Sequence, residues 1–396
     1  MQRSIELQSK ISGAISKSCD IVFGINFYFL LAFIIIYAVI QNGIWFFPGI
    51  NHSLSMSQDI FTNPFDEEIG RQWQLYSYLG PIIGNSIGMN NSSIIYALMH
   101  LIIFLIFFVL LLIIIKKQRG DFIARSVAIA FFLTPLPNIL LTWLGSADIF
   151  TILFSITIAI FYRNYLILLL LSFMMGFNHF EQGLVILVSM TIFLIVNRNN
   201  SKPNNVLPFV ITGIGGIVIG RLCLEWYFHC NDFNIQSSRL EYIMDLGIAR
   251  YAKATFSNIF VLVFSFYNAL LIFIIVFACY FYKSRIFFTF VICNAMIFVV
   301  TICTLDQTRV FSIMTFHLIL LLITSKNIYN LDLMEKAFLK KVITVAFIIG
   351  LFVPRFVVWD GKVHASTAYY SMQYLLGNYD IKNDKHTVTR ILLPLQ

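Results

Sequence analysis

Long apolar segments recur along the chain, and they limit its fold more than any motif does. A helix needs about 20 apolar residues to cross the hydrocarbon core of a bilayer. The runs expected to cross are 22–42, 94–115, 122–143, 184–197, 206–222, 257–282, 286–304, 310–325 and 342–358. Two shorter runs, 149–162 and 165–177, are expected either as short helices buried among their neighbours or as a re-entrant pair. If both are counted as spans, the chain is an all-α, polytopic transmembrane helix bundle with about 11 spans.

The composition agrees with lipid as the main solvent of the chain. Hydrophobic residues make up 59% of the sequence and charged residues 12%, whereas soluble proteins carry about 25% charged residues. The net charge of +8 does not indicate a nucleic-acid partner, because the basic residues lie in short loops and form no patch interleaved with aromatic side chains. Membrane lipids are therefore the expected surroundings, and no nucleic acid is expected as a partner.

The basic residues also predict the orientation of the chain. Lys and Arg are enriched in cytoplasmic loops, and alternation from a cytoplasmic N-terminus places most short basic loops inside. The expected organisation is a cytoplasmic segment 1–21, a transmembrane bundle 22–358 and an outside C-terminal tail 359–396. The two long outside loops are 43–93 and 223–256. The N-terminal segment is either a helix on the membrane surface or a polar tail.

Acidic residues follow the opposite bias and gather on the outside. The longer outside loops explain part of this bias, and acids contribute little to topology. Loop length does not explain Asp148, Glu181 and Asp306, which stand where apolar helices meet short outside turns. These three acids mark a candidate active face.

The first outside loop contains the run Asp66-Glu67-Glu68, followed by Arg71. A carboxylate above the membrane can act as a general base toward an acceptor hydroxyl. Asp66 and Glu67 are therefore candidate catalytic residues, and Glu68 and Arg71 are candidate substrate-binding residues. The alternative is a solvated acidic loop with aromatic residues in the headgroup region.

Two short turns between apolar helices carry further candidates. In the Gly-Ser-Ala-Asp turn 145–148, the aspartate is either a substrate-binding residue or the N-cap of the next helix. The turn 176–183 contains His179 and Glu181 together with two amide side chains. Ionisable groups near a bilayer usually line a cavity, so His179 and Glu181 are expected to contact a substrate, with helix capping as the alternative.

Outside arginines indicate a possible site for an anion. Arg221 and Arg250 lie at or in the second long outside loop, whose residues 237–253 are expected as a short amphipathic surface helix. Arg309 follows Asp306 at helical spacing where two spans meet. An arginine can bind phosphate with two donors. The alternatives are snorkelling of Arg221 and Arg250 at the interface and mutual neutralisation of Asp306 and Arg309.

The sequence predicts neither a disulfide nor a metal site. A disulfide between Cys223 and Cys230 requires an oxidising compartment, and two free thiols are the favoured expectation. No Cys/His zinc spacing occurs. Carboxylates can hold a divalent metal, but no spacing here requires one, so no metal ligand and no cofactor is assigned.

The order of these features resembles the GT-C superfamily of integral-membrane glycosyltransferases over about residues 20–325. A first span is followed by an outside loop with an Asp-Glu pair, then by a Gly-Ser-Ala-Asp turn that opens a helix, and then by a His-x-Glu turn. A second outside loop with a surface helix follows, and an Asp-x-x-Arg motif precedes a late helix. The acid pair lies later after the first span than in many members of that superfamily.

The resemblance implies a polyprenyl-phosphate-linked sugar as donor and reaction on the outer face of the membrane. It implies Asp66 or Glu67 as the general base, while the neighbouring Glu68 leaves the choice open. The implied phosphate ligands are Arg309, Arg221 or Arg250, and the implied pocket residues are Asp148, His179 and Glu181.

The predicted function is inverting transfer of a sugar from this donor to a glycan or lipid-linked acceptor. The expected location is the bacterial inner (cytoplasmic) membrane, with a periplasmic or extracellular active face. A polysaccharide polymerase or ligase of another membrane fold is one alternative, which would rely on arginine more than on a carboxylate base. A lipid or glycan transporter (flippase) is the other, but the sequence shows neither the mid-membrane charges nor the inverted repeats typical of transporters.

Overall fold

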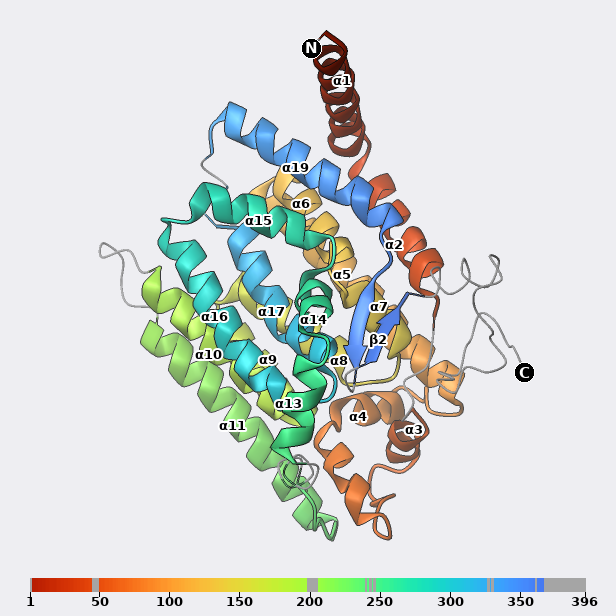
Figure 1. Ribbon diagram of the computed structural model, residues 1–396. Coiled ribbons are helices and arrows are strands. Elements are labelled where there is room, and N and C mark those ends of the chain that lie inside the picture. Colours follow the sequence, from red (N-terminus) through yellow and green to blue (C-terminus); the bar gives the residue numbers. More distant parts are fainter. Residues whose placement is uncertain are drawn as a thin grey trace, which may run out of the picture.

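The computed structural model describes residues 2–44, 50–197, 206–238, 241, 244, 247–325, 328, 331–359 and 362–366. These residues form an all-α fold apart from one two-stranded hairpin (Figure 1). Three of the described helices are long and apolar enough to cross a membrane, and the number rises to 6 if each of 3 bent helix pairs is one span. These helices indicate a multi-pass membrane protein. The larger predicted number of spans and the orientation stay predictions.

The first half of the chain consists of helices, most of them apolar, with three short helices inserted in the loop 43–93. In order these are α1 (Gln2–Gly24), α2 (Phe27–Asn42), α3 (Ile50–Gln58), the 3₁₀ helix η1 (Ile69–Tyr76), α4 (Leu79–Ser86), α5 (Ser93–Arg119), α6 (Asp121–Leu133), α7 (Leu136–Thr142), α8 (Asp148–Phe161) and α9 (Tyr165–Asn178).

The second half continues with helices and ends in the hairpin. In order these are α10 (Phe180–Val196), α11 (Val206–Cys230), α13 (Ile248–Phe256), α14 (Ile259–Tyr267), α15 (Leu270–Phe281), α16 (Arg285–Ile302), α17 (Gln307–Ile323), α19 (Leu333–Phe352), β1 (Phe356–Trp359) and β2 (Lys362–Ala365).

The N-terminal segment is helical from Gln2 to Gly24, and its position on a membrane surface stays a prediction. The part of α1 from Ser12 to Gly24 makes an angle of 103° with α2. Figure 1 shows that α1 projects from the bundle. Large apolar side chains are exposed elsewhere on the molecule, such as Phe29, Leu166 and Phe260. Contiguous exposed apolar surface is typical of a protein that faces lipid.

Two runs expected as continuous spans are bent pairs. The run 122–143 bends by 62° between α6 and α7, where Pro135 and Pro137 lack the N–H groups that a continuous helix requires. The run 257–282 bends by 86° between α14 and α15. Asn268 stands at this second break with a positive φ of 46°, and its side chain binds both the backbone N–H and the carbonyl of Phe356.

Helix α17 forms the centre of the bundle. Every residue from Val310 to Ile323 is buried, as expected for a helix that is apolar all round. Helix α8 packs against it and is also largely buried. With 14 residues, α8 is about 21 Å long, which is shorter than the roughly 30 Å of a hydrocarbon core. The predicted runs 149–162 and 165–177 are therefore two short helices, of which α8 is buried among its neighbours.

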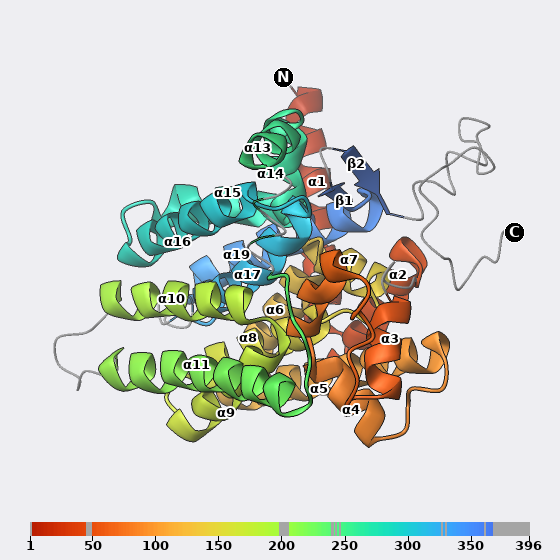
Figure 2. The ribbon, with the colours of Figure 1, turned by 90° about the horizontal axis from the view of Figure 1, so that it is seen from below.

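Helices α9, α10 and α11 lie side by side along one flank of the bundle (Figures 1 and 2). Helices α9 and α11 approach so closely that a Cβ atom on Gly220 would lie 2.1 Å from the carbonyl oxygen of Phe173. This contact fixes the end of α9, where the turn with His179 begins.

The two loops that are predicted to lie outside, 43–93 and 223–256, pack on each other. The side chain of Gln72 donates to the carbonyl of Asn234 at 3.1 Å and accepts from the N–H of Gln236 at 2.6 Å. A second apolar cluster, separate from the main core, joins the same loops through Tyr78 and Phe228. The first eight residues of the expected loop 223–256 are the end of α11, which continues to Cys230. The six cysteines are free in this structure.

The chain does not remain helical to residue 358. Helix α19 ends at Phe352 because Pro354 follows within two residues. The β1–β2 hairpin then packs on the bundle, where the N–H of Val358 donates to Thr308 Oγ1 at 2.9 Å. The expected boundary between bundle and tail at 358/359 falls inside this hairpin, and the division of the chain into domains stays a prediction.

Candidate functional site

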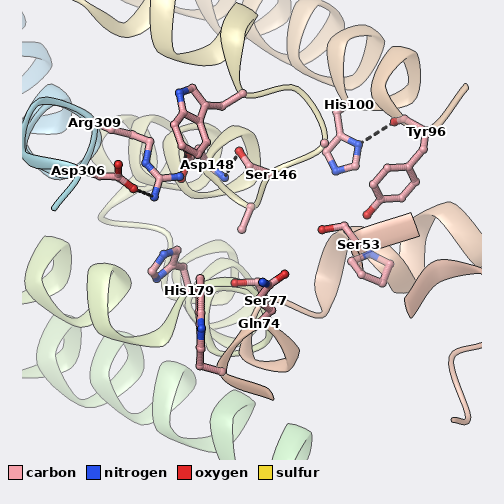
Figure 3. A pocket seen from close by; sticks show the side chains of 16 residues that line it. Ser53, Gln74, Ser77, Tyr96, His100, Ser146, Asp148, His179, Asp306 and Arg309 are labelled. Carbon is pink, nitrogen blue, oxygen red and sulfur yellow. Dashed lines mark hydrogen bonds and ion pairs between the residues drawn. The ribbon is translucent and has the colours of Figure 1, made fainter. Parts of the chain in front are cut away.

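A cavity of about 140 Å³ lies where the loop 43–93 meets the ends of the central helices (Figure 3). Its walls combine charged, aromatic and small polar side chains. The lining residues are Ser53, Trp73, Gln74, Ser77, Gly80, Pro81, Tyr96, His100, Trp143, Gly145, Ser146, Ala147, Asp148, His179, Asp306 and Arg309. The predicted residues Asp148, His179, Asp306 and Arg309 thus come together in one place, although they belong to separate turns.

Arg309 occupies the charged end of the cavity. Its Nη1 lies 3.2 Å from Asp148 Oδ2 and its Nη2 lies 2.5 Å from Asp306 Oδ2. The guanidinium also lies over the Trp143 ring, 4.3 Å from the ring centroid. Its buried Nε atom has no hydrogen-bond partner among the described residues. The cluster therefore retains one unsatisfied donor.

Neither aspartate caps a helix through its side chain. Asp148 is the first residue of α8, where Ala147 is the N-cap and no side chain caps the helix. Asp306 is the N-cap of α17 but makes no capping hydrogen bond through its side chain. Both carboxylates instead bind Arg309, so the capping alternative for Asp148 is wrong. Asp148 is almost completely buried, with 2% of its side chain exposed, whereas Asp306 is 18% exposed.

Asn178 positions the turn that carries His179. Its side-chain amide donates to the carbonyl of Ala147 and to Thr151 Oγ1, both at 2.8 Å. These bonds tie the end of α9 to the start of α8. His179 consequently reaches the cavity, and its Nδ1 lies 3.7 Å from Glu181 Oε2. Glu181 is about half exposed and is not among the cavity-lining residues.

The first-loop acids lie outside the cavity. Asp66, Glu67 and Glu68 are exposed, and none of them lines it. Asp66 accepts a hydrogen bond from Asn63 Nδ2 at 2.7 Å. Arg71 forms an exposed ion pair with Glu68 at 2.9 Å. The structure therefore does not bring the predicted base next to Arg309.

The other two predicted arginines are also separate from the cavity. Arg221 forms an ion pair with Glu225 at 2.7 Å within α11, and its guanidinium lies 3.6 Å from the centroid of the Tyr76 ring. Arg250 is exposed on α13. The expected surface helix 237–253 lies partly outside the described residues. Neither arginine lines the cavity.

Several cavity residues were not predicted as site residues. His100 is a lone ionisable side chain inside the long apolar helix α5, and such a residue is a functional candidate by its position alone. Trp143 lies two residues before Gly145 of the Gly-Ser-Ala-Asp turn. Trp73 is one of the aromatic residues of the first loop, for which the sequence allows either stacking on a sugar ring or a position in the headgroup region. Gln74 and Ser77 carry no distinguishing pattern, because a 3₁₀ helix in a loop has no long periodicity.

No group of three or more His, Cys, Asp or Glu side chains within the described residues is placed to hold a metal ion. The cavity residues instead offer hydrogen-bond donors, acceptors and aromatic faces. No protein-family model matches the chain, and no curated protein or solved structure was found to be similar to it.

Proposed function

We propose that the protein is a membrane glycosyltransferase that takes a sugar from a polyprenyl-phosphate donor, with the reaction in the cavity at Arg309. One observation carries the proposal. A guanidinium stands at the ends of apolar helices, in a cavity that also presents a histidine and neutral polar side chains. A donor with a lipid tail, a phosphate and a sugar requires these three environments next to one another.

The phosphate is held by Arg309. With Asp148 and Asp306 the cluster has an excess of one negative charge, so a phosphate must compete for the guanidinium. The buried Nε atom is a donor without a partner among the described residues, and Asp306 is the exchangeable carboxylate because it is more exposed than Asp148. Asp148 keeps the guanidinium in place. Charge-assisted bonds from arginine to phosphate stabilise the leaving group as charge develops on it.

His179 is the proton acceptor in this proposal. Asp148 and Asp306 both bind the Arg309 guanidinium, so their carboxylate oxygens are already engaged. His179 lines the same cavity, and the Glu181 carboxylate near its Nδ1 stabilises the charged ring. Asp66 and Glu67 remain predicted bases whose positions in this structure do not favour them.

The reaction balances with these groups. The acceptor hydroxyl oxygen attacks the anomeric carbon of the donor sugar as the bond from that carbon to the phosphate oxygen breaks. The leaving polyprenyl phosphate keeps the electron pair and stays bound to Arg309. The hydroxyl proton goes to His179, and attack opposite the leaving group inverts the anomeric centre.

The test is sugar transfer in membranes that contain the full chain, with a panel of radiolabelled polyprenyl-phosphate sugars. Arg309→Lys is expected to lower transfer by about 100-fold, because Lys cannot donate two parallel bonds. His179→Gln is expected to lower it by about 100-fold or more. Arg250→Lys is the matched control and is expected to retain activity.

The same assay separates the two sets of candidate bases. Asp66→Asn and Glu67→Gln are expected to retain transfer within a few-fold of the wild type. Loss of transfer in either variant, with full activity in His179→Gln, would move the base to the first outside loop. Full activity in Arg309→Lys and His179→Gln together would overturn the proposed site.

A further inference from the structure

The cavity has a second, uncharged end, formed by Tyr96 and His100 of α5. Both residues are fully buried and both line the cavity. Figure 3 shows them beside Ser53, across the cavity from Asp306 and Arg309. The Tyr96 Oη and His100 Nε2 atoms have no hydrogen-bond partner among the described residues. A buried polar atom without a partner destabilises the folded state, so two such atoms in one cavity wall require an explanation.

The two atoms have complementary hydrogen-bonding roles. His100 Nδ1 lies 2.9 Å from the backbone carbonyl of Tyr96, and a carbonyl can only accept. Nδ1 therefore carries the proton, which leaves Nε2 as a bare acceptor. The Tyr96 hydroxyl can donate. The pair thus offers one acceptor and one donor.

Gly80 keeps the space in front of these atoms open. A Cβ atom at Gly80 would lie 3.0 Å from His100 Nε2 and 3.0 Å from Tyr96 Oη. Both polar atoms therefore face the same small volume beside α4. Any larger residue at position 80 would press on both atoms and fill part of this volume.

We infer that Tyr96 and His100 bind a hydroxyl group of the donor sugar. An alcohol donates to Nε2 and accepts from Oη at the same time, whereas an unprotonated phosphate oxygen cannot donate to Nε2. One cavity with a guanidinium at one end and an alcohol-binding pair at the other matches a molecule that contains both a phosphate and a sugar. The inference rests on the proposed function and assigns the sugar to the end of the cavity opposite Arg309.

The experiment compares two lipids on the full chain in nanodiscs. The probes are undecaprenyl phosphate without a sugar and the same lipid carrying glucose, mannose or arabinose. The wild type is expected to bind the preferred sugar-bearing lipid about tenfold more tightly than the bare lipid, as one well-paired hydroxyl allows. Tyr96→Phe and Gly80→Ala are expected to bring the two affinities to within about twofold. Affinity for the bare lipid should remain at the wild-type value in both variants.

Tyr267→Phe is the matched control. Tyr267 is also a buried tyrosine, but its hydroxyl donates to Asn294 Oδ1 at 2.6 Å and it does not line the cavity. This variant should lose stability while it keeps the preference for the sugar-bearing lipid. Tyr96→Phe removes an oxygen without a partner, so it should fold as well as the wild type.

The outcomes distinguish this inference from the proposed function. If Tyr96→Phe keeps the full preference for the sugar-bearing lipid, the two atoms serve only an internal water or the packing, and the inference is overturned while the phosphate site stands. If Tyr96→Phe weakens both lipids equally, its role is structural and the inference is also overturned. If the wild type binds neither lipid, the proposed function fails together with the inference.

Discussion

Arg309 and Asp148 form an ion pair across 161 residues of sequence, with Arg309 Nη1 at 3.2 Å from Asp148 Oδ2. The pair joins the start of α17, the central helix, to the start of α8. Because Asp148 is buried, the pair fixes the relative position of these two helix ends and of the cavity between them. The same guanidinium binds Asp306, so one side chain compensates two carboxylates.

Loss of this guanidinium is expected to destabilise the protein. Arg309→Gln leaves two carboxylates without their cation, one of them buried, and breaking a buried pair costs about 3–5 kcal/mol. The matched control is Arg119→Gln, which changes an exposed arginine at the end of α5 and should alter stability by less than about 0.5 kcal/mol. Thermal unfolding in detergent would measure both. Equal stability of the two variants would show that the ion pairs at Arg309 are not structural.

The two aspartates should respond differently to neutralisation. Asp306→Asn removes the exchangeable competitor for Arg309, so the affinity for undecaprenyl phosphate is expected to rise by about tenfold. Asp148→Asn removes the carboxylate that holds the guanidinium in place, and it is expected to lower stability and to give no such gain. Binding in nanodiscs measures both effects. A fall in affinity in Asp306→Asn would contradict the exchange of Asp306 for phosphate.

The close contact of α9 and α11 at Gly220 leads to a third prediction. Gly220→Ala would place a Cβ atom 2.1 Å from the Phe173 carbonyl oxygen, so the helices must separate and the turn at His179 must move. Gly215→Ala on the same helix meets no atom within 4 Å and is the matched control. Gly220→Ala should lower both the unfolding temperature and the rate of sugar transfer. Gly215→Ala should leave the rate unchanged, and it should leave the unfolding temperature unchanged or raise it, because Ala favours a helix over Gly by about 1 kcal/mol. Similar behaviour of the two variants would show that the contact does not position the site.

The stability of the folded protein is expected to decrease slightly at acidic pH because of His52. Burial and the neighbouring Arg71 hold the pKa of His52 below its ordinary value of 6.5, while Glu68 acts in the opposite direction. In the unfolded chain, His52 therefore takes up a proton as the pH falls through about 6.5. In the folded chain it takes up this proton only at a lower pH. The folded state consequently loses stability as the pH falls below about 6.5. Unfolding temperatures between about pH 7.5 and about pH 5 should fall less in His52→Gln than in the wild type. An equal fall in both would contradict this assignment.

Much of the helical pattern could be predicted because long apolar runs have few alternatives. Local breaks could not be placed in the same way. The bend at Asn268 depends on its bonds to Phe356, which lies 88 residues away in sequence. The hairpin after Pro354 could not be predicted either, because its position depends on a bond from Val358 to Thr308.

The site was predictable where a charge interrupted an apolar context. Asp148, His179, Asp306 and Arg309 stood out in this way, and the cavity contains all four. The acid run at Asp66 was attractive for its composition, but composition does not show which way a loop faces. His100 is an ionisable residue within an apolar helix, which the sequence alone can reveal. Tyr96 lies in the same helix, and only the unpartnered state of its hydroxyl in three dimensions distinguishes it from a core residue.

The most direct test of the central claim is an experimental structure of the full chain in nanodiscs with undecaprenyl phosphate. We expect density for the phosphate in contact with Arg309, next to Nε, with the Asp306 carboxylate displaced and Asp148 still bound. A phosphate bound at Arg221 or Arg250 while the cavity at Arg309 holds no lipid headgroup would contradict the proposed site.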